Sequence, residues 1–252
     1  MKGIIAAFAM YSKIPMPKTE WNKKNMRYAM MFFPLVGVVI GGMLWLWHWL
    51  VAQFNMAGFL FAAGATVLPL LLTGGLHMDG FIDTVDAWHC YGSPAKRRAV
   101  LKDPHVGALG VIWCSIYLLV VLGLWAQLYE QPRLIWLAAA GCFFSRALTA
   151  LVSITEKTAN QGGILHSFAS NAEKKPVIVV LSAFLLIVSA VGIRFEPVVC
   201  MLLLLSILLV SKLCVRAARR EFAGVSGDLA GFFLQIIELV ILVAAAIGGV
   251  FL

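Results

Sequence analysis

Residues 73–103, TGGLHMDGFIDTVDAWHCYGSPAKRRAVLKD, lie between two strongly apolar stretches and concentrate much of the chain's charge. They contain four of the twelve acidic residues and a basic run at 96–98. Asp79, Asp83 and Asp86 follow the spacing i, i+4, i+7. In a helix this spacing places the three carboxylates within an arc of roughly 60° on one face.

The composition of the chain indicates an integral membrane protein. Hydrophobic residues make up 62% of the sequence and charged residues only 13%. The apolar residues form runs of roughly twenty, the length that a helix needs to cross the hydrocarbon of a bilayer. These runs lack the alternation expected of a membrane β-barrel. We therefore predict an all-α, polytopic membrane helix bundle that forms one domain over residues 1–252.

About seven transmembrane helices are expected, preceded by a short interfacial helix within residues 1–11. The predicted crossings cover residues 31–51, 58–75, 106–128, 134–154, 176–193, a segment ending near 213, and 228–250. The N-terminal segment and the three longer loops contain seventeen Lys and Arg residues, whereas the three short turns contain two. Because basic loops stay in the cytoplasm, we place the N-terminus and the long loops there. The net charge of +8 then reflects topology, and we expect a lipid bilayer, not nucleic acid, as the partner.

The acidic face predicts a metal site. Like charges on one helix face repel each other, and clustered carboxylates select a hard divalent cation, Mg²⁺ or alternatively Mn²⁺. A solvated helix face is the simpler alternative. The predicted topology brings Asp103 and Asp228 to the same membrane boundary, and we predict Asp228 as a ligand beside Asp79, Asp83 and Asp86. An N-cap role for Asp228 is equally compatible with its position.

Two ionisable residues lie inside predicted crossings. Arg146 lies about two turns into the fourth crossing, and Glu238 shares one face of the seventh with Asp228, Gly231 and Gln235. Ionisable residues at such depth are expensive and usually functional. Arg146 either binds a substrate phosphate or pairs with Glu238, and the sequence leaves both open. Gln235 and Glu238 are further site candidates.

Other charged groups near this boundary are candidates as well. Lys96, Arg97 and Arg98 are predicted to contact substrate phosphates, although they also fit the positive-inside signal. His105 is a candidate general base or phosphate contact. His77 and Asp103 are further site candidates, to which we assign no particular role.

Carboxylates, a divalent ion and basic groups at one boundary favour the attack of an alcohol on a phosphodiester or pyrophosphate. The catalytic groups expected for this reaction are Asp83, Asp86 and His105, one of which takes the proton of the attacking hydroxyl.

Several motifs of the chain resemble the cobalamin synthase family. They are TGGLHMDGFIDTVDA at 73–87, LKDPHVGALG at 101–110, KIPMP at 13–17, FPLVG at 33–37, the pair Ser145-Arg146, and SGDLAG at 226–231. The resemblance implies a Mg²⁺-dependent enzyme in the inner membrane of a prokaryote. Such an enzyme joins adenosylcobinamide-GDP to α-ribazole or its 5′-phosphate and releases GMP.

The resemblance also implies site residues and partners. The family's acidic motif falls on Asp79, Asp83 and Asp86, and the acid of its last-helix motif falls on Asp228. The implied partners are the two substrates and the bilayer, with other enzymes of cobalamin assembly or a second copy of the chain as further expectations.

Two other functions are compatible with an acidic membrane protein. A CDP-alcohol phosphotransferase uses a similar cluster, but its D-x-x-D-G motif has glycine after the second aspartate, and here the glycine follows the first. A cation-coupled transporter should hold its ion near the midplane of the membrane, whereas these aspartates are predicted at the boundary.

Overall fold

The computed structural model describes residues 2–159 and 163–250 of the chain, and every regular element in those ranges is a helix. The helices are α1 (Lys2–Tyr11), α2 (Lys23–Met26), α3 (Ala29–Gln53), α4 (Gly58–Thr73), α5 (Leu76–His89), α6 (Pro94–Val100), α7 (Ala108–Leu128), α8 (Pro132–Thr155), α9 (Ile164–Asn171), α10 (Lys174–Phe195), α11 (Pro197–Phe222) and α12 (Gly227–Val250).

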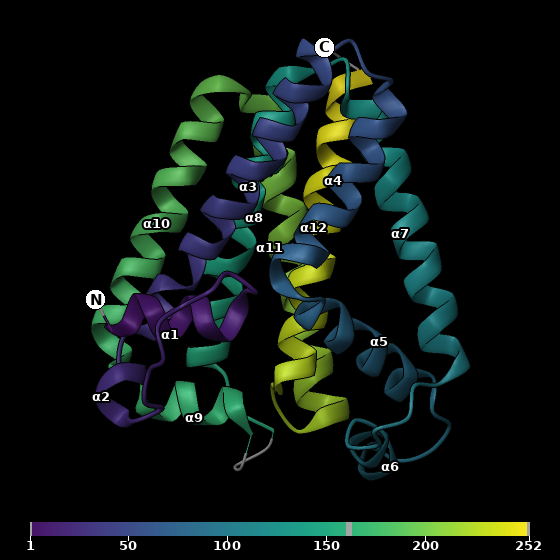
Figure 1. Cartoon of the computed structure of the whole chain (residues 1–252). Coiled ribbons are helices and arrows are strands. Elements are labelled where there is room, and N and C mark those ends of the chain that lie inside the picture. Colours follow the sequence, from purple (N-terminus) through teal and green to yellow (C-terminus); the bar gives the residue numbers. More distant parts are fainter. Residues whose placement is uncertain (1, 160–162, 251–252) are drawn as a thin grey trace.

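The helices form a membrane-spanning bundle (Figure 1). Within the described ranges, six helices are long and apolar enough to cross a membrane, and α4 with α5 forms a seventh segment that bends by 95°. The prediction of a polytopic all-α membrane protein is therefore confirmed. The sixth span is longer than predicted, because α11 continues to Phe222. Its extra turns carry basic residues that suit a helix leaving the membrane, and it ends where Ala223 adopts a left-handed conformation at φ 62°.

The bend between α4 and α5 comes from two consecutive glycines. Gly74 and Gly75 both have positive φ, 65° and 75°, a conformation that glycine adopts without steric cost. The backbone N–H of Gly75 donates to the carbonyl of Leu70 at 2.9 Å, which closes the last turn of α4. The chain then starts α5 almost at right angles, so the aspartates of α5 lie on a helix that runs across the end of the bundle (Figure 1).

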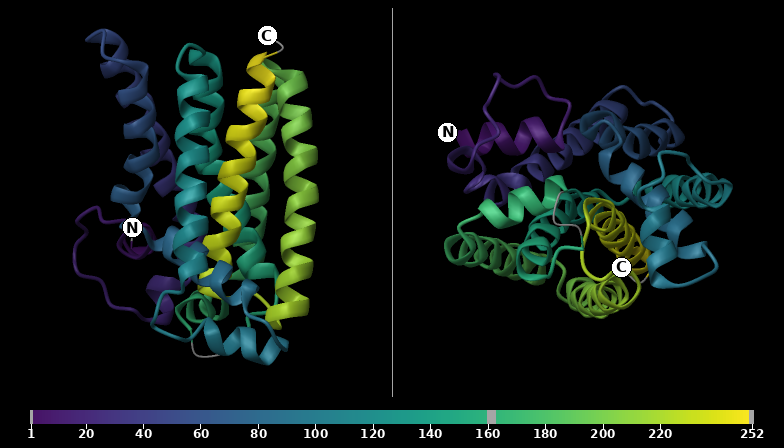
Figure 2. Two further views of the ribbon diagram at one scale, coloured as in Figure 1. Left: turned by 90° about the vertical axis from the view of Figure 1, so that its right-hand side faces the viewer. Right: turned by 90° about the horizontal axis from the view of Figure 1, so that it is seen from below.

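The last helix lies inside the bundle. In Figure 2, α12 is surrounded by α5, α7, α8 and α11, and it packs against all four. The helices α1, α2, α6 and α9 lie at the end of the bundle where α12 begins, opposite the C-terminal end of α12 (Figure 1). The basic loops thus gather at one end, as predicted. The helix predicted within residues 1–11 is α1, which buries Ala6, Ala7 and Tyr11; residue 1 lies outside the described part.

Candidate active site

The crossing of α5 and α12 brings two distant parts of the sequence together. A Cβ atom added at Gly80 of α5 would lie 2.7 Å from the carbonyl oxygen of Asp228 and 2.8 Å from its Cα. A Cβ added at Gly231 of α12 would lie 3.0 Å from the carbonyl oxygen of His77. Glycines in both helices allow the two backbones to approach this closely. The start of α12 is therefore held directly against the acidic helix.

The acidic side chains gather at this crossing. The carboxylates of Asp79, Asp228 and Asp86 all lie close enough to Asp83 to act on its charge. Asp228 lies in the first turn of α12, where the positive end of the helix dipole favours a negative charge. The N-cap role belongs to Ser226, whose hydroxyl accepts the backbone N–H of Leu229 at 3.2 Å. Asp228 is thus not needed as the cap, and its carboxylate is available to the cluster.

The carboxylates suit a Mg²⁺ ion that is shared with substrate. Their oxygens are hard ligands, and their mutual repulsion favours a cation between them. In the described ranges no three acidic, imidazole or thiol groups converge closely enough to hold an ion alone. Mg²⁺ usually keeps several waters and is bound by one or two carboxylates together with substrate phosphates. The arrangement therefore fits a substrate-completed site and not an all-protein cage.

A cavity of about 250 Å³ adjoins the acid cluster. Asp79 and Asp228 both line it, together with residues of α1, α3, α8 and α9. We call it the α1 cavity, and its further lining residues include Tyr11, Phe33, His77, Thr149 and Ser153. The two acids from α5 and α12 thus line a partly open cavity that is large enough for a small organic group.

Comparison with known proteins identifies the family. The family model described as cobalamin-5-phosphate synthase matches residues 3–246. The chain belongs to the cobalamin-5-phosphate synthase family. It is 37% identical to an adenosylcobinamide-GDP ribazoletransferase of Lachnoclostridium phytofermentans, over 95% of this chain and 91% of that protein. Proteins of the same name from Clostridium botulinum (28% identity, 98% and 97% coverage) and Treponema denticola (26%, 96% and 96%) are also similar. No solved structure matches.

Asp86, in the family's acidic motif, makes a structural contact that the spacing of the three aspartates did not predict. One carboxylate oxygen accepts the backbone N–H of Gly107 and the other accepts that of Gly110, both at 2.7 Å. Asp86 thereby caps the first turn of α7. Each oxygen has a second lone pair, so a role as metal ligand stays a prediction beside this observed one. The LKDPHVGALG and DGFIDTVDA motifs are joined through this contact.

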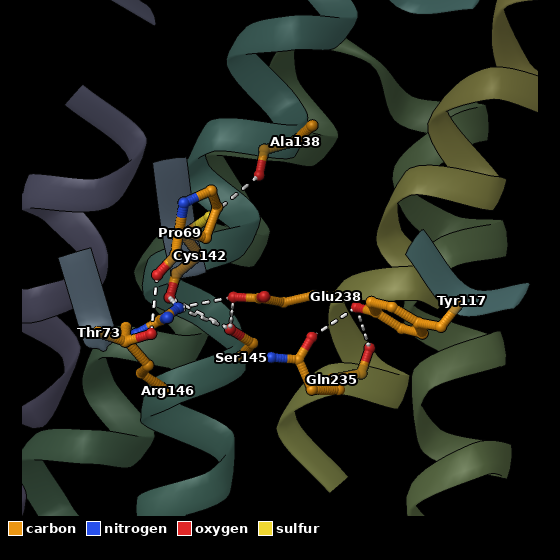
Figure 3. Close-up of polar contacts among 9 residues, drawn as sticks. All are labelled: Pro69, Thr73, Tyr117, Ala138, Cys142, Ser145, Arg146, Gln235 and Glu238. Atoms are coloured by element: carbon orange, nitrogen blue, oxygen red, sulfur yellow. Dashed lines mark hydrogen bonds and ion pairs between the residues drawn. The ribbon is translucent and has the colours of Figure 1, made fainter. Parts of the chain in front are cut away.

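The buried Arg146 and the partly buried Glu238 form an ion pair within the bundle (Figure 3). Arg146 Nη1 lies 2.6 Å from Glu238 Oε1 and also donates to the carbonyl of Cys142. Ser145 Oγ donates to the same glutamate oxygen. Of the two roles that the sequence left open for Arg146, the structure shows the pair with Glu238. The side chain of Arg146 is 1% exposed, and its contact with a substrate phosphate stays a prediction.

Gln235 belongs to the same internal polar layer (Figure 3). Its Oε1 accepts the hydroxyl of Tyr117 on α7 at 2.6 Å, and its side chain is buried. A polar pair of this kind satisfies groups that would otherwise be costly in the membrane interior. The structure therefore places Gln235 in the contact between α12 and α7.

The basic run and the histidine of the loop face different neighbours. Arg97 pairs with Glu221 and ties α6 to α11, whereas Lys96 is exposed and Arg98 is half-buried. Asp103 Oδ1 accepts the backbone N–H of His105 at 3.0 Å and lies 2.7 Å from its Nδ1. The backbone hydrogen bond, followed by the side chain of His105, lowers the pKa of Asp103. His105 is thus engaged in an exposed turn, and its role as a base stays a prediction.

Sequence reasoning did not identify the hydroxyls of the α1 cavity. Thr149 and Ser153 follow Arg146 on α8 at intervals of three and four residues, so the three polar residues form a stripe within an apolar span. That stripe was the available signal. It carries no information about α1, which also lines the cavity.

Proposed function

We propose that the chain is a Mg²⁺-dependent transferase of the last steps of cobalamin assembly. It moves the cobinamide-phosphate moiety of adenosylcobinamide-GDP to α-ribazole, or to its 5′-phosphate, and GMP is released. Family membership over residues 3–246 and the name shared by the similar proteins support this reaction over phospholipid synthesis or cation transport.

One structural observation carries the proposal. Asp79 and Asp228, 149 positions apart in the chain, line one cavity at the end of the bundle where α5 crosses α12. Both carboxylates belong to an acidic cluster with Asp83. Such a cluster has no packing role that would compensate for its repulsion, whereas a metal–pyrophosphate complex neutralises it.

The chemistry divides among the chain's residues. One or two of the carboxylates of Asp79, Asp83 and Asp228 would hold Mg²⁺ together with the phosphates of the substrate, with Asp86 as a further predicted ligand. When bound, the ion would neutralise the pyrophosphate and stabilise the leaving phosphate. A ribose hydroxyl forms a new O–P bond to the phosphorus that bears cobinamide, while the P–O bond to GMP breaks. The hydroxyl proton passes to a carboxylate, and we assign this role to Asp83, because both oxygens of Asp86 already accept hydrogen bonds.

The orientation of the site follows from charge. The end of the bundle that carries the acid cluster also carries the basic loops, which we assign to the cytoplasmic face of a prokaryotic inner membrane. The exposed Lys96 at this end could attract the phosphates of the donor. A corrinoid with an apolar rim would lie at the boundary between membrane and cytoplasm.

The proposal is tested with the purified full chain in proteoliposomes. Adenosylcobinamide-GDP and α-ribazole are supplied with Mg²⁺ or with a chelator, and GMP and the corrinoid product are quantified by chromatography. We expect release of GMP only with Mg²⁺. Asp83→Asn should lower turnover roughly a hundredfold or more, the scale of losing a group that stabilises transition-state charge.

Glu173→Gln is the matched control. This acid lies at the same end of the bundle and forms a half-exposed pair with Arg27, so its amide variant should keep normal turnover. Undiminished GMP release by Asp83→Asn, or by the wild-type chain in chelator, would contradict the assignment.

A further inference from the structure

Three polar side chains of the α1 cavity are buried without partners. His77 is 5% exposed, Thr149 4% and Ser153 1%. In the described ranges, both ring nitrogens of His77 and the hydroxyls of Thr149 and Ser153 have no hydrogen-bond partner. Buried polar groups in folded proteins are nearly always paired. The unpaired groups line the same cavity as Asp79 and Asp228, so they point to a polar ligand beside the acid cluster.

The two hydroxyls differ from several others in the helices of this bundle, although Thr84 and Ser211 also have no partner. A Ser or Thr in a helix commonly donates to the carbonyl one turn earlier, and Thr66, Ser115 and Thr155 do so at 2.8–2.9 Å. Thr155 is on α8 with Thr149 and Ser153, yet neither of these two makes such a bond. Their hydroxyls remain free to bond a molecule in the cavity.

Part of the cavity lining is apolar and aromatic. The rings of Tyr11 and Phe33 lie 4.1 Å apart between centroids, and the ring of Phe33 lies 5.7 Å from that of His77. Met10 and Met30 complete this part of the lining. Aromatic rings and thioethers pack well against a planar aromatic group. The lining of the cavity thus combines aromatic rings, hydroxyls and the carboxylates of Asp79 and Asp228.

The size and the walls together select a nucleoside. The volume of about 250 Å³ equals the share of roughly eight water molecules, which is suited to a nucleoside and too small for a corrin ring. Two nucleosides take part in the proposed reaction. The base of guanosine carries several hydrogen-bonding groups at its edge, and an apolar wall would leave them unpaired. The benzimidazole base of α-ribazole carries a single acceptor, its unsubstituted ring nitrogen, and no donor.

We propose that the α1 cavity is the acceptor site, which binds α-ribazole with its base against Tyr11 and Phe33. Its ribose hydroxyls bond to Thr149, Ser153 and His77, and the attacking hydroxyl lies at the edge formed by the aspartates. A neutral imidazole offers one donor and one acceptor, which matches hydroxyl groups. The donor, with its corrin ring, remains outside the cavity. This inference rests on the proposed function, because it names the site of one of that reaction's substrates.

The experiment measures acceptor binding apart from catalysis. The full chain in lipid nanodiscs is titrated with α-ribazole by calorimetry, without donor. Thr149→Val and Ser153→Ala each remove one hydroxyl with little change in shape. Each should weaken α-ribazole binding about fivefold, the size of one lost hydrogen bond. In turnover assays, KM should rise for α-ribazole and stay unchanged for adenosylcobinamide-GDP.

Two further variants control the result. Thr149→Ser keeps the hydroxyl and should bind like the wild type, and Thr155→Val removes a hydroxyl on the same helix that already bonds its own backbone. Thermal unfolding of each variant verifies that the bundle is intact. Normal α-ribazole affinity in both Thr149→Val and Ser153→Ala would overturn the assignment of the acceptor site, and so would a raised KM for the donor alone. In either case, GMP release by the wild type would still support the proposed reaction. A wild-type chain that releases no GMP would instead refute the proposed function itself.

Discussion

The close approach of α5 to α12 makes Gly80→Ala a stringent test of the site. The added Cβ would lie 2.7 Å from a backbone oxygen of Asp228, and ordinary van der Waals contact begins at 3.4 Å, so the helices must separate by about 0.7 Å. Backbone atoms cannot rotate away as a side chain can. Because the two helices carry the acids, the separation shifts Asp79 and Asp83 relative to Asp228. A misplacement near 1 Å can cost about a hundredfold in rate, and we expect a loss of roughly ten- to a hundredfold.

The assay is GMP release at saturating substrates, with thermal unfolding of the same samples. Gly42→Ala and Gly123→Ala are matched controls in α3 and α7, since a Cβ at either position meets nothing within 4 Å. Both should keep full activity and gain up to about 1 kcal/mol of helix stability. Overpacking at Gly80 should cost about 1–3 kcal/mol. Equal activity in Gly80→Ala and Gly42→Ala would refute the view that this spacing positions the acids.

Two other substitutions test the supporting contacts. Glu238→Gln leaves the buried charge of Arg146 without its partner, so we expect a loss of about 3–5 kcal/mol in thermal or denaturant unfolding; unchanged stability would show that the pair is not needed. Asp86→Ala removes the acceptor of the Gly107 and Gly110 N–H groups and should cost about 1–2 kcal/mol. Hydrogen exchange should then increase at the start of α7, and protection equal to the wild type would contradict the capping role.

The sequence was sufficient to predict those features of the fold that depend on local composition and spacing. The apolar runs predict the spans because only their length and hydropathy matter. The spacing of Asp79, Asp83 and Asp86 places them on one face if the segment is helical, and the structure has α5 there. The distribution of basic residues predicts which loops share an end of the bundle, and this places Asp228 near the other acids before any contact is known.

What the sequence could not predict depends on contacts between distant segments. The 95° corner requires both glycines 74 and 75 to adopt positive φ, and glycines in membrane helices serve packing just as often. The choice of partner for Arg146 was left open, because a phosphate and Glu238 satisfy a guanidinium equally well. The unpaired hydroxyls of Thr149 and Ser153 become apparent only in the folded structure, where α1 and α8 line the same cavity.

The polar residues of α12 explain how this helix presents Asp228 correctly. In a membrane, apolar side chains are as compatible with lipid as with each other, so hydrophobicity alone does not fix the rotation of a buried helix. Asp228, Gly231, Gln235 and Glu238 share one face at spacings of three and four residues. Gly231 packs on α5, Gln235 bonds to α7, and Glu238 bonds to Arg146 of α8. Each contact specifies the same rotation of α12. The Arg146–Glu238 pair, about 15 Å from Asp228 along the helix, therefore also sets the direction of the Asp228 carboxylate.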